Sequence, residues 1–504
     1  MNFTPLIRLI FAKYVKSSLE WIANGEQVQR AQLAMMIKAA KSTFWGEKYD
    51  FASINTYEDF AARVPMSPYE DIRPLVTRMI NGERDILWPG RIRNYAQSSG
   101  TSDGKSKYIP ITPDSFRLCH YRGAYYPVAF YLNQFPDSHA FSGKGFILGG
   151  SFANELSLPK DVVVGDLSAN LIHRIPTLIN MFRVPSKEVA LLEDWSVKLP
   201  ALVDASINQN ITNISGVPSW FLTVLKEVIK KAGASTIHDV WPDLEVFFHG
   251  GISFDPYREQ YKAITDPSKM RYLETYNASE GFFAAQNDIN DRAMMLILDA
   301  GVFYEFIPLN EIDSPTPTLL PLWKVEPGKV YAMVITSCNG LWRYPLGDTV
   351  KIESVNPVKI TIAGRTKHYI NAFGEELMVH NANAAITKAC QQLGCSILNY
   401  TAAPVYAGDR SRGRHEWLIE WSRQPENLEE FANLLDELLQ QENSDYQAKR
   451  FKDIFLDRLS VVTAQSGLFN RWLASTGKLG GQRKVPRLCN DRRFIDPMLE
   501  LNNN

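Results

Sequence analysis

The densest group of residues that could do chemistry is the segment QSSGTSDGKSKYIPIT, residues 97–112. Glycines let backbone N–H groups come close to an anion, and hydroxyls add further donors. The glycines and hydroxyl residues of this segment include Ser98, Ser99, Gly100, Thr101, Ser102 and Gly104. Lys105 and Lys107 add positive charge. The composition predicts a loop that binds polyphosphate, although a solvated surface loop has the same composition. It is not the GxxxxGK[ST] loop, because Ser99 stands where that pattern has its first glycine.

Two further segments supply aromatic and acidic groups. In YNASE, residues 276–280, Tyr276 could stack on a base, Ser279 could touch a phosphate and Glu280 could hold a divalent cation. Upstream, FFHGGISF ends an apolar strand with Gly250 and Gly251, which allow a flat ring to lie on the backbone. Ligands gather beyond the carboxyl ends of strands in open parallel sheets. YNASE taken alone also fits a polar turn after a strand.

Three short segments nearer the carboxyl end carry charge. In RYPLGD, Asp348 follows a glycine turn and could accept hydrogen bonds from two ribose hydroxyls, or simply cap the turn. The sequence GRTK, residues 364–367, could hinge two domains or serve as a plain linker. In GGQRKVPRL, residues 480–488, Lys484 lies in a basic loop of the kind that is commonly just solvated.

The hydrophobic pattern predicts an α/β body that positions these segments. The first ninety residues have a mainly helical pattern, and apolar runs at 145–148, 244–248, 294–298 and 330–336 predict strands. A helix is predicted at 218–232, where apolar residues recur at helical spacing. Alternation of strands and helices favours an α/β fold whose sheet is largely covered.

The pattern changes near residue 363, which predicts two domains. Residues 1–363 form the large one, and residues 364–504 have strands and helices enough for a smaller α+β domain with its own core. In the second domain a strand is predicted at 415–421, between helices at 381–393 and 426–440. The tail LELNNN is predicted to be frayed.

Composition narrows the function classes. The 504 residues are 45% hydrophobic with a formal charge of −1, which excludes disordered, collagenous and disulfide-scaffold proteins and gives no support for nucleic-acid binding. Five scattered cysteines indicate free thiols in a reducing compartment. The segment MNFTPLIRLIFAKYVKSSLEW has the pattern of an amphipathic helix rather than a signal peptide, and no run approaches a membrane span. We therefore expect a cytoplasmic protein without nucleic-acid or membrane partners, and leave the oligomeric state open.

Together, and in this chain order, the motifs resemble the adenylate-forming superfamily that includes acyl-CoA synthetases and firefly luciferase. SSGTSDGKSKYIP, ASEGFF and QRKVPR are most similar to the auxin-responsive Gretchen Hagen family of acyl-acid amido synthetases. The resemblance covers about residues 60–490, and the chain looks shorter than plant members, so it is similar to the prokaryotic branch. In YPLGD, Pro345 stands where the superfamily has an arginine, and Arg343 precedes the aromatic residue instead.

The resemblance implies a role for each matching residue. Contacts to ATP are implied for Ser98, Ser99, Gly100, Thr101, Gly250, Gly251, Tyr276, Ser279, Asp348 and Arg365. Glu280 would bind magnesium, Lys367 would sit at the domain hinge, and Lys484 would neutralise the reacting carboxylate and α-phosphate. The fold implied is a large adenylate-forming domain with sheets flanked by helices, followed by a small mobile lid domain.

The implied reaction joins a carboxylic acid to an amino acid through an acyl-adenylate, with AMP and pyrophosphate released. An acyl-CoA ligase with the same first step is the alternative enzyme, and an adenylate-binding or transcription-associated protein without turnover is the alternative of another class. For the acyl group we expect a pocket that draws on Tyr125, Tyr126, Phe247, Phe248 and His249. Core packing of these side chains is the competing interpretation.

Overall fold

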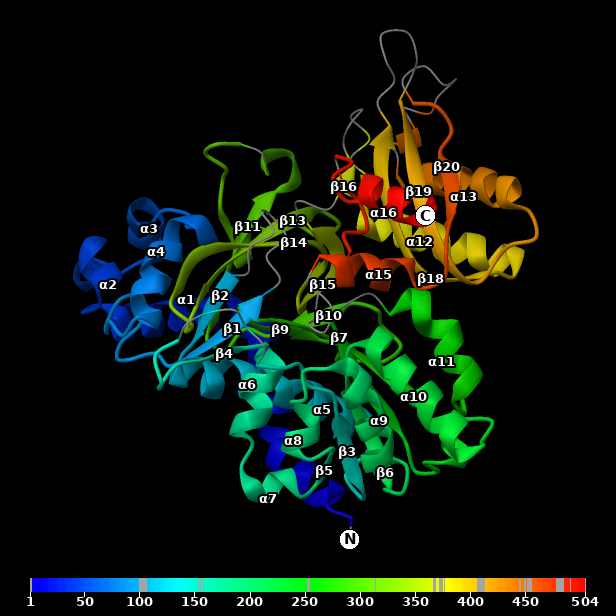
Figure 1. Cartoon of the computed structure of the whole chain (residues 1–504). Coiled ribbons are helices and arrows are strands. Elements are labelled where there is room, and N and C mark those ends of the chain that lie inside the picture. The colour runs from blue at the N-terminus through cyan, green and yellow to red at the C-terminus, as the bar shows by residue number, and fades with distance from the viewer. Residues whose placement is uncertain are drawn as a thin grey trace. The chain divides into compact units, whose positions relative to one another are not determined.

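The computed structural model describes residues 2–98, 107–152, 154, 156, 158–251, 254–312, 314–365, 369–370, 375, 377–405, 413–443, 446–447, 450, 456–476, 485–489 and 491–503. The chain divides into two compact units (Figure 1). The first contains Met1–Phe254, Glu259–Leu346 and Lys351–Thr361, and the second contains Asp255–Arg258, Gly347–Val350 and Ile362–Asn504. The sequence placed the boundary at 363/364, and the long segment of the second unit begins at Ile362.

A twelve-stranded sheet dominates the first unit. Its strand order is β12 (Leu320–Pro321), β11 (Val302–Pro308), β13 (Val330–Ser337), β14 (Leu341–Val355), β15 (Val358–Arg365), β10 (Met294–Leu296), β9 (Gly281–Ala285), β8 (Arg271–Ala278), β7 (Val246–Gly250), β6 (Ile211–Gly216), β3 (Lys144–Ile147) and β5 (Arg183–Val184). The run from β5 to β8 is parallel, and β9 turns back antiparallel to β8. The four strands expected from apolar runs are confirmed as β3, β7, β10 and β13.

Helices cover both faces of the parallel strands, which confirms the expected α/β class. Successive residues of β7 point to opposite faces. Phe247 packs on Phe221 of α10 (Pro218–Ala232), with ring centroids 5.4 Å apart. Phe248 packs on Tyr131 of α5 (Arg122–Gln134), at 5.8 Å. Helix α10 has the predicted bounds because Pro218 starts it and Gly233, at φ +64°, ends it.

Further helices and a small sheet complete the first unit. The helices are α1 (Thr4–Ala40), α2 (Phe44–Lys48), α3 (Tyr57–Arg63), α4 (Tyr69–Ile80), α6 (Leu167–Arg174), α7 (Thr177–Asn180), α8 (Lys187–Ala190), α9 (Trp195–Ser206) and α11 (Arg258–Ile264). A three-stranded sheet has the order β2 (Lys107–Ile111), β1 (Asn94–Ser98), β4 (Val163–Gly165). Buried Gln29 of α1 donates to the carbonyls of Leu298 and Val302, so this helix is anchored to β11.

The second unit has its own core. Its sheet has the order β18 (Ser396–Val405), β19 (Arg414–Arg423), β20 (Ser460–Ala464), and β16 (Tyr369–Ile370) pairs with β17 (Leu377–Met378). The helices are α12 (Val379–Leu393), α13 (Leu428–Glu442), α15 (Leu468–Ser475) and α16 (Ile495–Asn503). The predicted fraying of the tail is wrong, because α16 runs to Asn503 and Asn502 hydrogen-bonds Thr463 and Gln465.

Candidate active site

The hydroxyl- and glycine-rich loop begins and ends in a hairpin. Ser98 and Lys107 face each other in the register of β1 and β2. Residues 99–106 lie outside the described residues, as does the side chain of Ser98, so the roles of Ser98, Ser99, Gly100 and Thr101 stay predictions. Lys107 is described, and its Nζ donates to the Tyr344 hydroxyl at 3.3 Å. The hairpin therefore fixes one end of the loop beside β14.

The Tyr344 hydroxyl also contacts Glu280. Glu280 occupies the turn between β8 and β9, with 6% of its surface exposed. The Tyr344 hydroxyl donates to Glu280 Oε1 at 3.4 Å, and the Asn339 amide donates to the Glu280 carbonyl at 2.7 Å. Tyr344 thus links Lys107, next to the glycine-rich loop, to the carboxylate of the YNASE motif. Two motifs about 170 residues apart meet at one place.

The Glu280 carboxylate fits a magnesium ion only together with other ligands. Among the described residues there is no group of three His, Cys, Asp or Glu side chains that could hold a metal. Magnesium is usually bound through one or two carboxylates plus substrate phosphates and water. One buried carboxylate, linked through Tyr344 to Lys107, matches the protein's share of that donor set, whereas a metal held by protein ligands alone does not.

Tyr276 is packed rather than open. Its side chain is 5% exposed, and its ring centroid lies 5.0 Å from that of Phe283 at an interplanar angle of 58°. The start of β9 has no room for a side chain at Gly281, where a Cβ would lie 3.2 Å from Cys119 Sγ and 2.8 Å from the Phe283 ring. The hairpin that carries Tyr276 and Glu280 is therefore held tightly against the segment that leads into α5.

The glycine pair follows the expected geometry at the end of β7. Gly250 pairs with Thr275 of β8, and a Cβ on Gly250 would lie 2.4 Å from the Thr275 carbonyl oxygen. Gly251 has φ +81°, a conformation that favours glycine. Glycine is therefore favoured at both positions, at Gly250 because a Cβ would clash and at Gly251 because φ is positive. The pair lies at the carboxyl edge of parallel strands, where ligands gather.

Arg343 is a structural residue. Its guanidinium forms a bidentate ion pair with Glu305, at 3.0 Å and 2.8 Å, and both side chains are buried. Nη1 also donates to the carbonyls of Ala61 and Val64. With all these donors used inside the first unit, Arg343 does not replace the arginine that the superfamily pattern has at the position of Pro345.

The remaining predicted nucleotide residues are described only in part. Asp348 is 8% exposed and follows Gly347, whose φ is +86°. Ser279 lies in the turn before Glu280. Arg365 ends β15, but its side chain lies outside the described residues. Lys367 and Lys484 also lie outside them.

The residues expected in the acyl pocket do not lie together. Tyr126 is fully buried and packs on Tyr14 and Trp21 of α1. Phe247 and His249 lie on the opposite side of the sheet from α5 and pack on Phe254, with His249 stacked on that ring at 4.3 Å. Because α5 covers the Phe248 face, one cavity cannot be lined by Tyr126 and Phe247 together.

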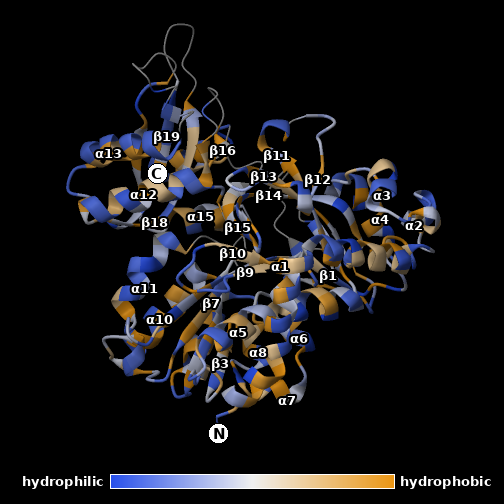
Figure 2. Ribbon diagram, turned by 180° about the vertical axis from the view of Figure 1, so that it is seen from behind, coloured by the Kyte–Doolittle hydropathy of each residue, from blue (hydrophilic) through white to orange (hydrophobic). Residues whose placement is uncertain are grey.

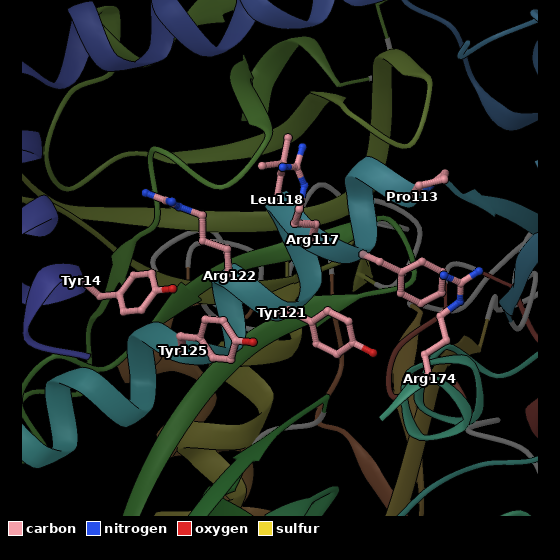
Figure 3. A pocket seen from close by; sticks show the side chains of 9 residues that line it. Tyr14, Pro113, Arg117, Leu118, Tyr121, Arg122, Tyr125 and Arg174 are labelled. Atoms are coloured by element: carbon pink, nitrogen blue, oxygen red, sulfur yellow. The ribbon is translucent and has the colours of Figure 1, made fainter. Parts of the chain in front are cut away.

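Tyr125 does line a cavity, which has a volume of about 520 Å³ (Figure 3). The lining side chains come from α1, α5, α6, the π-helix Ser115–Tyr121 and the residues just before it: Tyr14, Pro113, Phe116, Arg117, Leu118, Tyr121, Arg122, Tyr125 and Arg174. Arg174 lies 4.1 Å from the Phe116 ring centroid, and Arg122 pairs with Asp299. The cavity combines aromatic rings with guanidinium groups.

The sequence singled out Glu280 and Lys107 but missed the residue that joins them. Tyr344 was part of the RYPLGD motif, and its burial and its bond to Glu280 carry no local signal because the two are 64 positions apart. Asn339, which fixes the Glu280 backbone, was likewise not identified.

Comparison with known proteins gives a consistent result. Family models match in three parts: the GH3 family N-terminal domain at residues 16–270, the central domain at 295–365 and the C-terminal domain at 380–493. An indole-3-acetic acid-amido synthetase of Arabidopsis thaliana is 22% identical over 97% of this chain and 93% of its own. A jasmonoyl–L-amino acid synthetase of Oryza sativa subsp. japonica is 24% identical over 93% of both chains.

Solved structures agree in fold. The GH3.15 acyl acid amido synthetase superposes with a TM-score of 0.78 at 17% identity, over 97% of this chain and 96% of that one. A 2-hydroxyisobutyryl-CoA ligase superposes with a TM-score of 0.59 at 14% identity, over 94% and 91%. No described helix is both long and apolar enough to cross a membrane. Because the three family models together account for most of its residues, the chain belongs to the GH3 family.

Proposed function

We propose that this protein is an ATP-dependent acyl-acid amido synthetase. The observation that carries the proposal is the link from Lys107 through Tyr344 to Glu280, which brings the lysine at the end of the hydroxyl- and glycine-rich segment close to a buried carboxylate. A loop of N–H and hydroxyl donors beside a carboxylate can bind a polyphosphate with its metal. Family membership and the names of the relatives support the choice of amide synthesis.

The first half-reaction activates a carboxylic acid. A carboxylate oxygen attacks the α-phosphorus of ATP, the bond to the β-phosphate breaks, and pyrophosphate leaves. Two anions must approach, and unit charges at about 4 Å repel by roughly 4 kcal/mol at an effective dielectric near 20. Magnesium would supply charge neutralisation on the phosphates, held by Glu280. Lys484 would offset the charge at the reacting carboxylate and the α-phosphate.

The second half-reaction forms the amide. The amine of an amino acid attacks the carbonyl carbon of the acyl-adenylate, AMP leaves, and the ammonium proton is lost to solvent. Ser98, Ser99, Gly100 and Thr101 would bind the phosphates of ATP in the first step. Tyr276, Gly250 and Gly251 would position the adenine, Ser279 the α-phosphate, and Asp348 with Arg365 the ribose.

The acid must occupy a separate pocket. Of the residues expected there, Tyr125 stays in the proposal, because it lines the cavity beside α5 (Figure 3). Four aromatic rings around that space suit an apolar or aromatic acyl group. A panel of aryl, indolyl and jasmonate-like acids, tested with wild type and Tyr125→Ala, should show a changed order of acid preference in the variant.

Lys367 is proposed as a hinge residue at which the small domain rotates between the two half-reactions. If it is, Lys367→Pro should impair whichever half-reaction follows the rotation and spare the other.

The five thiols, all free, support a cytoplasmic location for the enzyme.

An acyl-CoA ligase is the second candidate, favoured by the superposition on 2-hydroxyisobutyryl-CoA ligase. Two assays separate the readings. Acid-dependent exchange of pyrophosphate into ATP tests adenylation, and its absence across the acid panel would leave a non-catalytic nucleotide-binding protein. Release of AMP that depends on an added amino acid supports amide synthesis, whereas release that depends on coenzyme A supports the ligase.

A further inference from the structure

The first turns of α1 expose large apolar side chains to solvent. Leu6, Leu9 and Ile10 are 55%, 75% and 50% exposed. Farther along the same helix, Tyr14, Ser18 and Trp21 are buried. Helix α1 is therefore held on one side by α5, and its outward side presents large aliphatic groups to solvent. Isolated exposed leucines are common, but a cluster of this kind marks an interaction site.

A second group of exposed apolar residues adjoins the first. Ile179 of α7, and Met181 and Phe182 between α7 and β5, are 58%, 59% and 46% exposed. The Phe182 ring contacts the Phe3 ring edge-to-face, with centroids 5.3 Å apart. Figures 1 and 2 both show α7 beside the start of α1. We call Leu6, Leu9, Ile10, Ile179, Met181 and Phe182 the apolar surface.

Positive charge accompanies the apolar surface. Arg8, Lys13 and Lys16 are exposed on the same two-and-a-half turns of α1, and the sequence has no Asp or Glu before Glu20. Within the described part of the chain, none of the three cations forms an ion pair with a carboxylate. The whole chain is nearly neutral, at −1. Arg8 donates to the Pro136 carbonyl at 2.9 Å, and exposed Asp137 follows that residue, so the positive charge next to the exposed aliphatic groups comes mainly from Lys13 and Lys16.

We propose that the apolar surface docks on an anionic phospholipid membrane, with the first turns of α1 lying in the plane of the interface. Interfacial helices bind through aliphatic groups inserted among the acyl chains and through Lys and Arg that face anionic headgroups. The expectation of no membrane partner rested on the lack of a spanning segment, which surface docking does not require.

A second copy of the chain fits this surface less well than a membrane. A twofold dimer brings the same surface of both copies together. Arg8, Lys13 and Lys16 of one copy would then face the same cations of the other, with no carboxylate in that part of the helix to compensate. An anionic headgroup layer instead attracts Lys13 and Lys16. The charge pattern therefore favours lipid over self-association.

Co-sedimentation of the full chain with vesicles tests the proposal. Vesicles of phosphatidylcholine alone are compared with vesicles that also contain phosphatidylglycerol, at low and high salt. We expect binding to the anionic vesicles that weakens with salt. Lys13→Gln/Lys16→Gln should weaken it by roughly 30-fold, since each cation near an anionic surface contributes about 1 kcal/mol. Leu6→Ser/Leu9→Ser/Ile10→Ser should abolish it.

The matched control is Leu19→Ser, which removes an equally exposed leucine (60%) farther along α1 and should leave vesicle binding unchanged. All the substituted side chains are exposed, so melting temperatures should stay at the wild-type value. No binding of the wild type to either vesicle would overturn the proposal. So would dimerisation in light scattering that the triple variant alone abolishes, because the apolar surface would then belong to a second copy.

Discussion

Replacement of Arg343 by Met should destabilise the first unit and leave ATP affinity unchanged. The Arg343 guanidinium pairs with Glu305, whose side chain is 1% exposed, and donates to two backbone carbonyls at the end of α3, those of Ala61 and Val64. Methionine fills much of the same volume without the charge. Glu305 would then remain as a buried carboxylate with only the Tyr57 hydroxyl, at 3.0 Å, as a described donor.

The magnitude follows from that uncompensated charge. Removal of one partner of a buried ion pair costs about 3–5 kcal/mol. A unit of about 350 residues loses roughly 1.4 °C of melting temperature per kcal/mol, so the expected decrease is about 4–7 °C. Arg343→Met combined with Glu305→Leu removes both charges and should recover a large part of the loss.

Lys351→Met provides the matched control on the same strand. Lys351 pairs with Glu353 at 3.0 Å, but these side chains are 39% and 30% exposed. An exposed pair contributes about 0–1 kcal/mol, so this variant should melt within about 1 °C of wild type. Differential scanning calorimetry measures the stability of all four proteins, and titration calorimetry with ATP measures their affinity. An Arg343→Met protein that melts normally but binds ATP weakly would refute the structural role and place Arg343 in the nucleotide site.

Four further predictions address the site and its surroundings. Tyr344→Phe removes the hydroxyl between Lys107 and Glu280 and should raise the magnesium requirement of pyrophosphate exchange by roughly 3–10-fold; an unchanged magnesium titration would mean that the link is not functional. Asp348→Ala should lose at least about tenfold in ATP affinity by calorimetry, whereas a lower melting temperature with intact affinity would make Asp348 a turn cap. Lys484→Ala should lose adenylation by about 10²–10³-fold, and near wild-type exchange would remove it from the catalytic residues. Burial lowers the pKa of His120 from 6.5 to about 4. Between these pH values the unfolded chain therefore binds one more proton than the folded protein. The free energy of unfolding should decrease by up to about 3 kcal/mol as the pH falls from 6.5 to 4. His120→Gln should lack this component, and a difference between the two proteins that does not vary with pH would contradict it.

The secondary structure was predicted best where local chemistry sets the boundaries. Helix α10 was predicted at 218–232 and observed there, because Pro218 and Gly233 fix its ends. Strand β7 was predicted at 244–248 and observed at 246–250. The apolar run ends at Phe248, but His249 and Gly250 continue the pairing with Glu274 and Thr275. Hydrogen bonding to a neighbouring strand, which hydropathy does not report, determines where β7 ends.

The sequence supplied candidate members of the site but not their contacts. Glu280 was identified because carboxylate chemistry and the motif agree, yet the Tyr344 hydroxyl that reaches it arrives on another strand. Arg343 shows the converse: its residue type allowed a role near the nucleotide, and only its pairing with Glu305 assigns it to the core. Residue type defines what chemistry is available, whereas burial and partners decide which chemistry is used.

The acyl pocket could have been predicted better from the sequence alone. Phe247 and Phe248 are neighbours in a strand, so their side chains must point to opposite faces of the sheet. A single pocket could therefore draw on one of them at most, and the helix that packs on each face decides which groups accompany it. The contacts of Phe247 with α10 and of Phe248 with α5 follow this rule. Tyr125, on α5, can share a cavity only with groups on the Phe248 side, and a search for the acid-binding residues should start there.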